Sequence, residues 1–317
     1  MKKISIIGAG QLGSRHLQGL KTAQTEIEIW VIDASEESLK VAKERCEAVE
    51  SKTPKIVHYN QNIEALPQNL DLVIIATSSK PRASIIKALL AHSSVSYLVL
   101  EKFLFTRLQD YDDIEILLKE KGVKCWVNCP RRMWPSYEAI KKLVVPEKPV
   151  TIEYSDQDWG MCCNSVHLID IWMCLAGDCP FDVDMSAIEP RVMESKRSGY
   201  IELFGKEVFR SSNGDVLVQT CLHEYSGNTD VIIRNDNNVF IVNESSGVWS
   251  INGNEHQTKT PYQSGLTGIL TDKILTTGDC RLTPYSISAQ YHKPYLRAVM
   301  DFINKLQDCD SDFCPIT

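Results

Sequence analysis

Apolar and polar positions along the first part of the chain follow a pattern of short strands separated by helices. Six apolar runs of strand length occur, at Ile4–Ile7, Ile27–Ile32, Lys55–His58, Leu72–Ala76, Val95–Leu100 and Val123–Val127. Apolar residues at helical spacing lie between several of them, over 35–49, 82–91 and 111–118. Strands that alternate with helices are typical of parallel βαβ units, and unbroken apolar strands such as "DLVIIAT" are typical of strands buried on both faces. We therefore expect an α/β protein whose residues 1–127 form a doubly wound parallel sheet.

After Asn128 the pattern changes. One helix is predicted over Val166–Leu175, and alternating segments such as "DVLVQTCLHEY", "TDVIIRND" and "NVFIVNES" follow, separated by short turns. Alternation with short turns predicts an antiparallel sheet that is open on one face. We expect residues 128–317 to form an α+β domain with a largely antiparallel open sheet. A closing helix over 285–306 can pack back on the first domain, and residues 308–317 read as a loose tail.

Composition narrows the class of protein. The 317 residues carry a net charge of −7 and 43% apolar residues, which are the values of an ordinary globular protein. The negative charge argues against a nucleic-acid or anionic-membrane partner. No stretch approaches the ~20 apolar residues that a membrane helix needs, and the N-terminus does not resemble a signal peptide. We expect a cytoplasmic protein that acts on a small molecule.

The eleven cysteines show no regular spacing. Without an export signal, we expect reduced thiols rather than disulfides. Cys162 and Cys163, with His167 nearby, form the one cluster that invites a metal hypothesis. A zinc site needs four protein ligands, or three when it is catalytic, and no further ligands are evident. We expect no metal; the two thiols are either packing residues or a redox-sensitive pair.

A glycine-rich turn follows the first strand directly. The segment "GAGQLG" contains Gly8, Gly10 and Gly13, with Gln11 and Leu12 before the third glycine, and a helical pattern begins there. The first glycine permits a tight turn, the second lets a pyrophosphate approach the backbone, and the third packs helix against strand. The free N–H groups of the helix N-terminus then attract the phosphates. The turn therefore predicts a dinucleotide-binding Rossmann domain.

Asp33 ends the second strand, twenty positions after Gly13. A carboxylate there can accept hydrogen bonds from the ribose hydroxyls of the adenosine half, and it would repel a 2′-phosphate. The sequence therefore favours NAD over NADP. The alternative is that Asp33 caps the following helix, which Ser35 could do equally well.

Two further segments carry candidate chemistry. Glu101 and Lys102 end the fifth strand, at the sheet edge where open α/β sheets bind ligands. An ammonium there can hydrogen-bond a substrate oxygen, or it can be a solvated partner of Glu101. His167 and Asp170 fall on the predicted helix, with His167 in its first turn, where the helix dipole favours a neutral imidazole. The alternative is a buried histidine bonded to Asp170 or to backbone.

These pieces together resemble the Gfo/Idh/MocA family of NAD(P)-dependent oxidoreductases, which act mostly on sugars, cyclitols and their activated derivatives. The resemblance lies in the ordered series "GAGQLGSRH", "ATSS", "EKF", "NCPRRMWP" and "GMCCNSVHLIDIW". It implies a catalytic Lys102 and a catalytic acid/base His167, and it places the loop Ala76, Thr77 and Ser78, with Glu101, beside the cofactor. It also implies substrate contacts from Asn128, Arg131 or Arg132, Trp159, Cys163 and Asn164.

The chain departs from the family pattern at several positions. Phe103 replaces the usual proline after Lys102, and Arg82 stands where a histidine is frequent. Cys163 stands four residues before His167, where many dehydrogenases of the family carry an aspartate. A thiol replaces a carboxylate poorly in proton transfer, so the proton route stays open.

Three functions fit these residues. The first is an NAD-dependent dehydrogenase or reductase of a sugar, cyclitol or activated sugar, in which Arg131 would grip a carboxylate or phosphate. The second keeps NAD but reduces an imine or assists a hydrolysis. The third is a sensor that binds NAD or a sugar without turnover, and the missing aspartate at Cys163 motivates it. The resemblance also implies a dimer or tetramer built on the open sheet.

Overall fold

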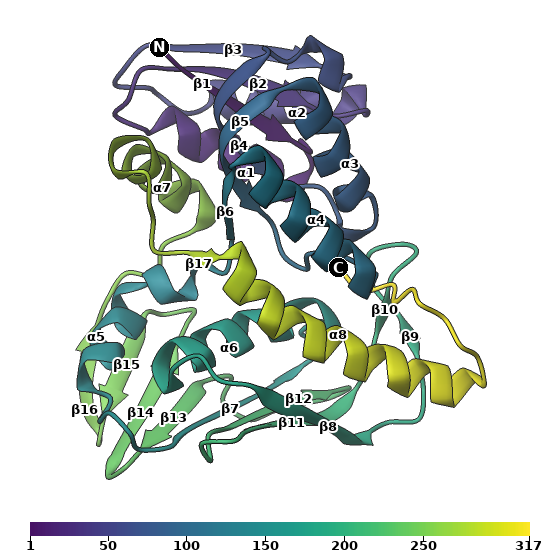
Figure 1. Ribbon diagram of the computed structural model, residues 1–317. Coiled ribbons are helices and arrows are strands. Elements are labelled where there is room, and N and C mark those ends of the chain that lie inside the picture. Colours follow the sequence, from purple (N-terminus) through teal and green to yellow (C-terminus); the bar gives the residue numbers. More distant parts are fainter. The chain divides into compact units, whose positions relative to one another are not determined.

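The computed structural model describes residues 1–317, which divide into two compact units. Unit 1 comprises residues 1–105, 110–128 and 261–285, and unit 2 comprises residues 106–109, 129–260 and 286–317. Figure 1 shows both units, with the chain coloured from purple to yellow. Each unit has its own sheet and its own apolar core.

The sheet of unit 1 has seven strands in the order β17-β6-β5-β4-β1-β2-β3. Its strands are β1 (Lys2–Ile7), β2 (Ile27–Ile32), β3 (Lys55–Asn60), β4 (Asn69–Ile75), β5 (Ser94–Leu100), β6 (Lys124–Val127) and β17 (Thr283–Pro284). All neighbouring strands are parallel except β17, which pairs antiparallel with β6. The strand order reverses beside β1, so the ligand crevice is expected at the carboxyl end of β1. The predicted doubly wound parallel sheet is confirmed.

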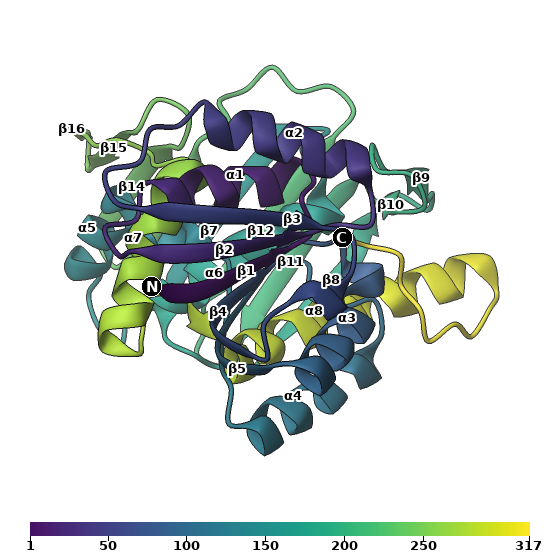
Figure 2. The same ribbon diagram turned by 90° about the horizontal axis from the view of Figure 1, so that it is seen from above.

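Helices cover both faces of this sheet. They are α1 (Gln11–Lys21), α2 (Glu36–Glu47), α3 (Ser79–His92), α4 (Leu108–Lys121) and α7 (Gln263–Thr277), with a short 3-10 turn η1 (Ile63–Ala65). Figure 2 shows α1 and α2 on one side of the strands and α3 and α4 on the other. Strand residues such as Ile4, Ile6 and Ile74 are fully buried, because parallel strands face helices on both sides.

Helix α7 belongs to unit 1, although the sequence analysis placed residues 261–285 in the second domain and predicted no helix there. It packs closely against α1. A Cβ on Gly19 would lie 2.6 Å from Cβ of Thr267, and a Cβ on Gly268 would lie 2.7 Å from the Gly19 oxygen. Only glycines allow the two helices to approach so closely. The packing of α7 on α1 and the pairing of β17 with β6 attach this segment to the first sheet.

Unit 2 is built on an eight-stranded sheet in the order β16-β15-β14-β13-β7-β12-β11-β8. Its strands are β7 (Val150–Gln157), β8 (Phe181–Ile188), β11 (Gly205–Ser211), β12 (Val216–Leu222), β13 (Val231–Asn235), β14 (Asn238–Asn243), β15 (Val248–Ile251) and β16 (Asn254–Gln257). Only β7 and β12 pair in parallel. The predicted, largely antiparallel sheet is confirmed.

The remaining elements of unit 2 complete its core. They are η2 (Pro130–Met133), α5 (Pro135–Leu143), α6 (Met161–Ala176), the paired strands β9 (Met193–Glu194) and β10 (Ile201–Glu202), and α8 (Tyr285–Gln307), of which Tyr285 alone falls in unit 1. Trp172 of α6 meets Phe181 of β8 and Phe209 of β11, with ring centroids 5.6 and 6.5 Å apart. Tyr295 of α8 packs on Phe209 at 5.8 Å. These rings join α6, α8 and the sheet.

The segment 308–317 is packed in unit 2, so the prediction of a loose tail is wrong. Cys314 and Ile316 are buried. The amide of Cys314 donates to the Thr106 oxygen, and the amide of Ile201 donates to the Pro315 oxygen. No helix of the chain is long and apolar enough to span a bilayer.

Candidate functional site

The glycine-rich turn of unit 1 has the close backbone contacts that the sequence predicts. Gly8 has φ +96°, and a Cβ there would lie 2.8 Å from the backbone of Ala76 and Thr77. A Cβ on Gly13 would lie 1.7 Å from the Gly8 oxygen, whereas one on Gly10 would meet nothing within 4 Å. Gly8 and Gly13 therefore close the turn between β1, β4 and α1, and Gly10 leaves open space beside it.

The N-terminus of α1 fits an anion. Gly10 is the N-cap and makes no side-chain capping bond, and no acidic residue lies in the first turn. The first N–H groups of a helix have no partner within the helix, and here they belong to Gln11, Leu12 and Gly13. The hydroxyl of Thr77 is buried without a hydrogen-bond partner, which leaves a polar atom beside the turn for a ligand. These features fit a bound dinucleotide, whose pyrophosphate would rest on the α1 turn.

Asp33 lies at the carboxyl end of β2, beside the same turn. Its Oδ2 accepts the Ala9 amide at 2.6 Å, and its Oδ1 accepts the Ser35 amide at 2.8 Å. Ser35, not Asp33, is the N-cap of α2, where its hydroxyl accepts the Ser38 amide. The carboxylate of Asp33 thus ties the glycine turn to the loop after β2 and is held at the edge where a ribose would lie.

Two loops follow β4 and β5 at this edge, and Arg82 holds them together. Its guanidinium is buried and donates to the backbone oxygens of Thr77, Phe103 and Leu104, the last at 2.8 Å. The peptide bond between Lys102 and Phe103 is cis. Lys102 itself is partly exposed, whereas Phe103 is fully buried. Arg82 therefore fixes the loop of Ala76, Thr77 and Ser78 relative to the segment that carries Lys102.

A buried polar network supports the same segment, and the sequence analysis missed most of its members. Glu101 Oε1 accepts from His16 Nε2 at 2.8 Å and from the amide of Asn128. The Asn128 amide also donates to Gln263, and His16 Nδ1 lies 2.9 Å from the hydroxyl of Thr267. Burial raises the pKa of Glu101, but hydrogen bonds from His16 and Asn128 outweigh it and lower the pKa below its ordinary value. The network joins α1, β5, β6 and α7 immediately beside Lys102.

Asn128 and the two arginines of "NCPRRMWP" are engaged within the fold. Asn128 is 3% exposed and belongs to the network in unit 1. Arg131 forms a bidentate pair with Glu244, with its Nε and a terminal nitrogen 2.5 and 2.7 Å from the two carboxylate oxygens. Arg132 forms a similar pair with Asp170. These side chains therefore have protein partners in this structure, and the grip of Arg131 on a substrate anion stays a prediction.

Helix α6 carries the predicted site residues Cys163, Asn164 and His167, and it starts earlier than predicted. It begins at Met161 rather than Val166, after Gly160, which has φ +69°. His167 is thus in the second turn, so the prediction that it lies in the first turn, near the dipole end, is wrong. Cys163 and Asn164 precede His167 by four and three residues, and residues at that spacing share one helix face.

A cavity of about 610 Å³ opens beside the first turn of α6. Trp159, Cys163 and Asn164, three of the predicted substrate residues, line it together with Glu202 and Phe204. The indole N–H of Trp159 donates to the Thr220 oxygen, and the Asn164 amide donates to the Trp159 oxygen at 2.8 Å. Burial raises the pKa of the Cys162 thiol well above its ordinary value, which is typical of an unreactive packing residue.

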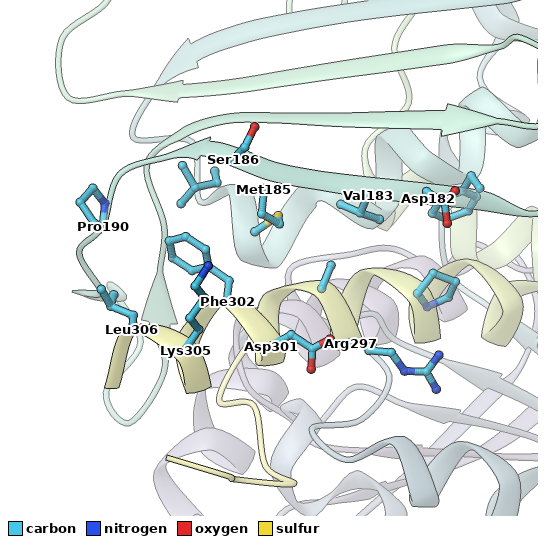
Figure 3. Close-up of a pocket in the computed structure, with 14 residues that line it drawn as sticks. Asp182, Val183, Met185, Ser186, Pro190, Arg297, Asp301, Phe302, Lys305 and Leu306 are labelled. Carbon is cyan, nitrogen blue, oxygen red and sulfur yellow. The ribbon is translucent and has the colours of Figure 1, made fainter. Parts of the chain in front are cut away.

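A larger hollow of about 1130 Å³ lies elsewhere in unit 2, between β8 and α8. Figure 3 shows its lining, including Met185 and Phe302. None of the predicted site residues lines it, so size alone does not identify the substrate site. No three His, Cys, Asp or Glu side chains gather in a group that could hold a metal ion.

Comparison with known proteins agrees with this geometry. Residues 2–129 match the family model GFO_IDH_MocA, described as an oxidoreductase family with an NAD-binding Rossmann fold. The first unit therefore contains the NAD-binding Rossmann fold of this oxidoreductase family. The match is to the Gfo/Idh/MocA model, as the motifs predicted, and it covers the N-terminal part of the chain. No curated protein matches the chain.

Solved structures share the fold of both units. An Agrobacterium radiobacter oxidoreductase in complex with NAD⁺, L-tartaric acid and magnesium matches at TM-score 0.69 and 13% identity, over 93% of this chain and 94% of that one. A Synechocystis biliverdin reductase with biliverdin and NADP⁺ matches at TM-score 0.67 and 16% identity, over 92% of this chain and 95% of that one. The UDP-N-acetylglucosamine 3-dehydrogenase of Acidithiobacillus ferrooxidans matches at TM-score 0.68 and 13% identity, over 93% of this chain and 96% of that one. At these identities the likeness is one of fold.

Proposed function

We propose that the protein transfers a hydride between NAD and a hydroxyl-rich substrate of the sugar or cyclitol type. The observation that carries the proposal is the α1 turn, with its open space at Gly10, its uncapped helix N-terminus and the carboxylate of Asp33 at the ribose position. The matching family model is one of NAD-binding oxidoreductases. The solved dehydrogenase of an activated sugar supports the substrate class by its fold alone.

The nicotinamide cofactor supplies the hydride acceptor when it is bound. Gly8, Gly10 and Gly13 would admit its pyrophosphate, Thr77 and Ser78 would lie along it, and Asp33 would accept the ribose hydroxyls. Because a carboxylate at that position repels a 2′-phosphate, NAD is the proposed cofactor rather than NADP.

Lys102 of unit 1 and His167 of unit 2 are the proposed catalytic residues. In the oxidation direction, His167 takes the proton of the substrate hydroxyl, and the ammonium of Lys102 stabilises the negative charge that develops on the oxygen. In the reverse direction the same imidazole returns the proton. Trp159, Cys163 and Asn164 hold the substrate in this proposal, since they line the cavity at the first turn of α6; His167, one turn further along the helix, does not line it. Asn128 and Arg131, which the resemblance also places at the substrate, contact Glu101 and Glu244 in this structure.

The test is stoichiometric turnover. Purified protein with NAD and a panel of sugars and cyclitols should form one NADH for each molecule of ketone product. Product that forms without an absorbance change at the NADH band would favour transient use of bound NAD. Binding of NAD without product across the whole panel would favour a sensor.

We also propose that the protein self-associates through the open face of its second sheet. Val239 and Ile241 of β14 are exposed there, and Ile232 of β13 pairs with Ile241. Apolar side chains gathered on one sheet face are typical of an interface. Sedimentation of the full chain checks this, and a monomer at assay concentration would contradict it.

A further inference from the structure

The cavity at the first turn of α6 contains a carboxylate that the sequence analysis did not find. Glu202 comes from β10 and is 7% exposed, yet it lines the cavity. Its Oε2 accepts the amide of Cys162 at 2.9 Å. Strand β10 is fixed on both sides, because it pairs with β9 and because the Ile201 amide donates to the Pro315 oxygen. The carboxylate therefore has a defined position at the helix N-terminus.

Glu202 supplies a carboxylate to the first turn of α6, which has no acidic residue of its own. Position 163 holds a thiol where a carboxylate was expected, and Glu202 reaches the same helical turn from a strand about forty residues away in sequence. A Cβ on Gly160 would lie 3.4 Å from Glu202 Oε1 and also 3.4 Å from Asn164 Nδ2. An acceptor and a donor therefore both lie close to Gly160, and all three residues line the cavity, so a substrate hydroxyl there has partners of both kinds.

The electrostatics of the cavity disfavour an anionic ligand. A helix N-terminus normally attracts an anion, but here Glu202 occupies that position. The lining holds three carboxylates, from Asp158, Glu194 and Glu202, against the cations of Lys196 and Arg197. Lys196 pairs with Asp158 at 3.0 Å, and Arg197 donates to the Thr317 hydroxyl at 3.1 Å. An additional carboxylate or phosphate would therefore enter a cavity in which negative side chains outnumber positive ones.

The rest of the lining suits a ring with apolar faces. Phe204 stacks on His223 with ring centroids 4.1 Å apart, and both line the cavity with Trp159. A volume of about 610 Å³ lies within the range of small-molecule sites, roughly 300–1,000 Å³. A monosaccharide or cyclitol presents C–H faces to aromatic rings and hydroxyls to polar groups.

We propose that Glu202 is the specificity-determining residue of this cavity, where it accepts hydrogen bonds from the hydroxyls of an uncharged sugar or cyclitol and excludes the acidic counterpart. This inference rests on the proposed function for the identity of the cavity as the substrate site. It reverses the expectation, based on Arg131, that the substrate is anionic.

The experiment measures equilibrium binding, so it is decided without turnover. The full chain saturated with NAD is titrated by calorimetry with matched pairs of probes, D-glucose against D-glucuronate and D-galactose against D-galacturonate, and with myo-inositol. The wild-type protein should bind a neutral probe at least about tenfold more tightly than its acid, which corresponds to one charge-assisted hydrogen bond. Equal or tighter binding of the acids, or binding of no neutral probe, would overturn the proposal.

The variant Glu202→Gln then tests whether Glu202 causes the preference for a neutral probe over its acid. The glutamine oxygen can still accept the Cys162 amide, so the helix start is retained while the charge is lost. The ratio of neutral to acidic affinity should fall about tenfold. Glu255→Gln, an exposed carboxylate on β16 that lines neither cavity, should leave the ratio unchanged. An unchanged ratio in Glu202→Gln would overturn the role of Glu202, and if that variant does not fold, the wild-type ratio alone decides. NADH formation, measured separately, shows whether the proposed function itself fails.

Discussion

Nε2 of His16 lies 2.8 Å from Oε1 of Glu101, and both side chains are buried in unit 1. The contact links the helix that follows the glycine turn with the strand end that carries Lys102. The cofactor turn and the proposed catalytic lysine are therefore supported by one network, and a change in one of its members should affect both stability and turnover.

Glu101→Gln tests the network directly. His16 and Asn128 both donate to Oε1 of Glu101, so the glutamine oxygen can keep both bonds, but they are no longer charge-assisted. The variant should therefore lose about 2 kcal/mol of unfolding free energy. Glu28→Gln is the matched control, because Glu28 makes a similar contact with His58 near the surface, at 2.9 Å. It should lose less than about 1 kcal/mol. Chemical denaturation measures both, and equal losses would contradict a special role for the buried pair.

The same variant has a defined pH dependence. The pKa of Glu101 is lowered in the folded protein, by His16 and Asn128 against the effect of burial. Its contribution is therefore present above the unfolded pKa of 4.5 and is lost as the pH falls through the lower folded pKa. The stability difference between wild type and Glu101→Gln should shrink in acid.

The contribution of Glu207 to stability should depend on pH in the opposite direction to that of Glu101. It is fully buried and accepts from Tyr295 at 3.0 Å and from Ser165 at 3.1 Å. Burial raises its pKa from 4.5 to about 8, against the effect of these hydrogen bonds. The folded state holds the proton longer than the unfolded state, so stability should fall by up to ~1.4 kcal/mol per pH unit between these two values.

Glu207→Gln, which is neutral at every pH, should remove this slope and stabilise the protein at pH 8. Thermal unfolding from pH 5 to pH 9 measures the effect in both proteins. A slope that persists unchanged in the variant would show that another group is responsible.

Two glycines of one turn should respond differently to alanine. Gly13→Ala places a Cβ 1.7 Å from the Gly8 oxygen, so the turn must open, and the loss of stability should be at least about 3 kcal/mol. Gly10→Ala meets nothing within 4 Å, so the protein should stay folded. Because the new methyl would occupy the approach of the pyrophosphate, NAD affinity should fall about tenfold or more. Calorimetric titration with NAD checks the second result, and unchanged affinity in Gly10→Ala would remove the pyrophosphate from this position.

Asp33→Ser tests the choice of cofactor. Loss of the carboxylate removes both the acceptor for the ribose hydroxyls and the repulsion of a 2′-phosphate. The ratio of NADH to NADPH affinity should fall about tenfold or more, as measured by the fluorescence of the reduced nicotinamide. Asp113→Ser, which alters an exposed partner of Lys87, is the control. A wild-type protein that already prefers NADPH would contradict the assignment.

The first unit could be predicted well because its signals are local. The glycine turn, the strand before it and Asp33 after the next strand lie within one βαβ unit, where strand ends meet at the same sheet edge. Helix α7 was not predicted, and the reason is physical. Its sequence has two glycines and several threonines, which are weak helix formers, and it is stabilised by close packing on α1 across about 240 residues of sequence.

The protein partners of the predicted site residues could not be foreseen, because they lie far away in the sequence. The sequence does not show that Arg131 pairs with Glu244. Nor does it show that Asn128 contacts Glu101 and Gln263. The start of α6 depended on Gly160 and on the Glu202 contact with Cys162. A single sequence contains no pairing information of this kind, because each partner lies on another element of the fold.

The proposed function assigns Lys102 a direct role in hydride transfer between substrate and NAD. Lys102→Met keeps the length of the side chain and removes its charge, so the most direct measurement is the turnover number of this variant together with its NAD dissociation constant. We predict that turnover falls at least about a hundredfold, the effect of a lost catalytic group, while NAD binding changes little. Near-normal turnover with the charge removed would contradict the account.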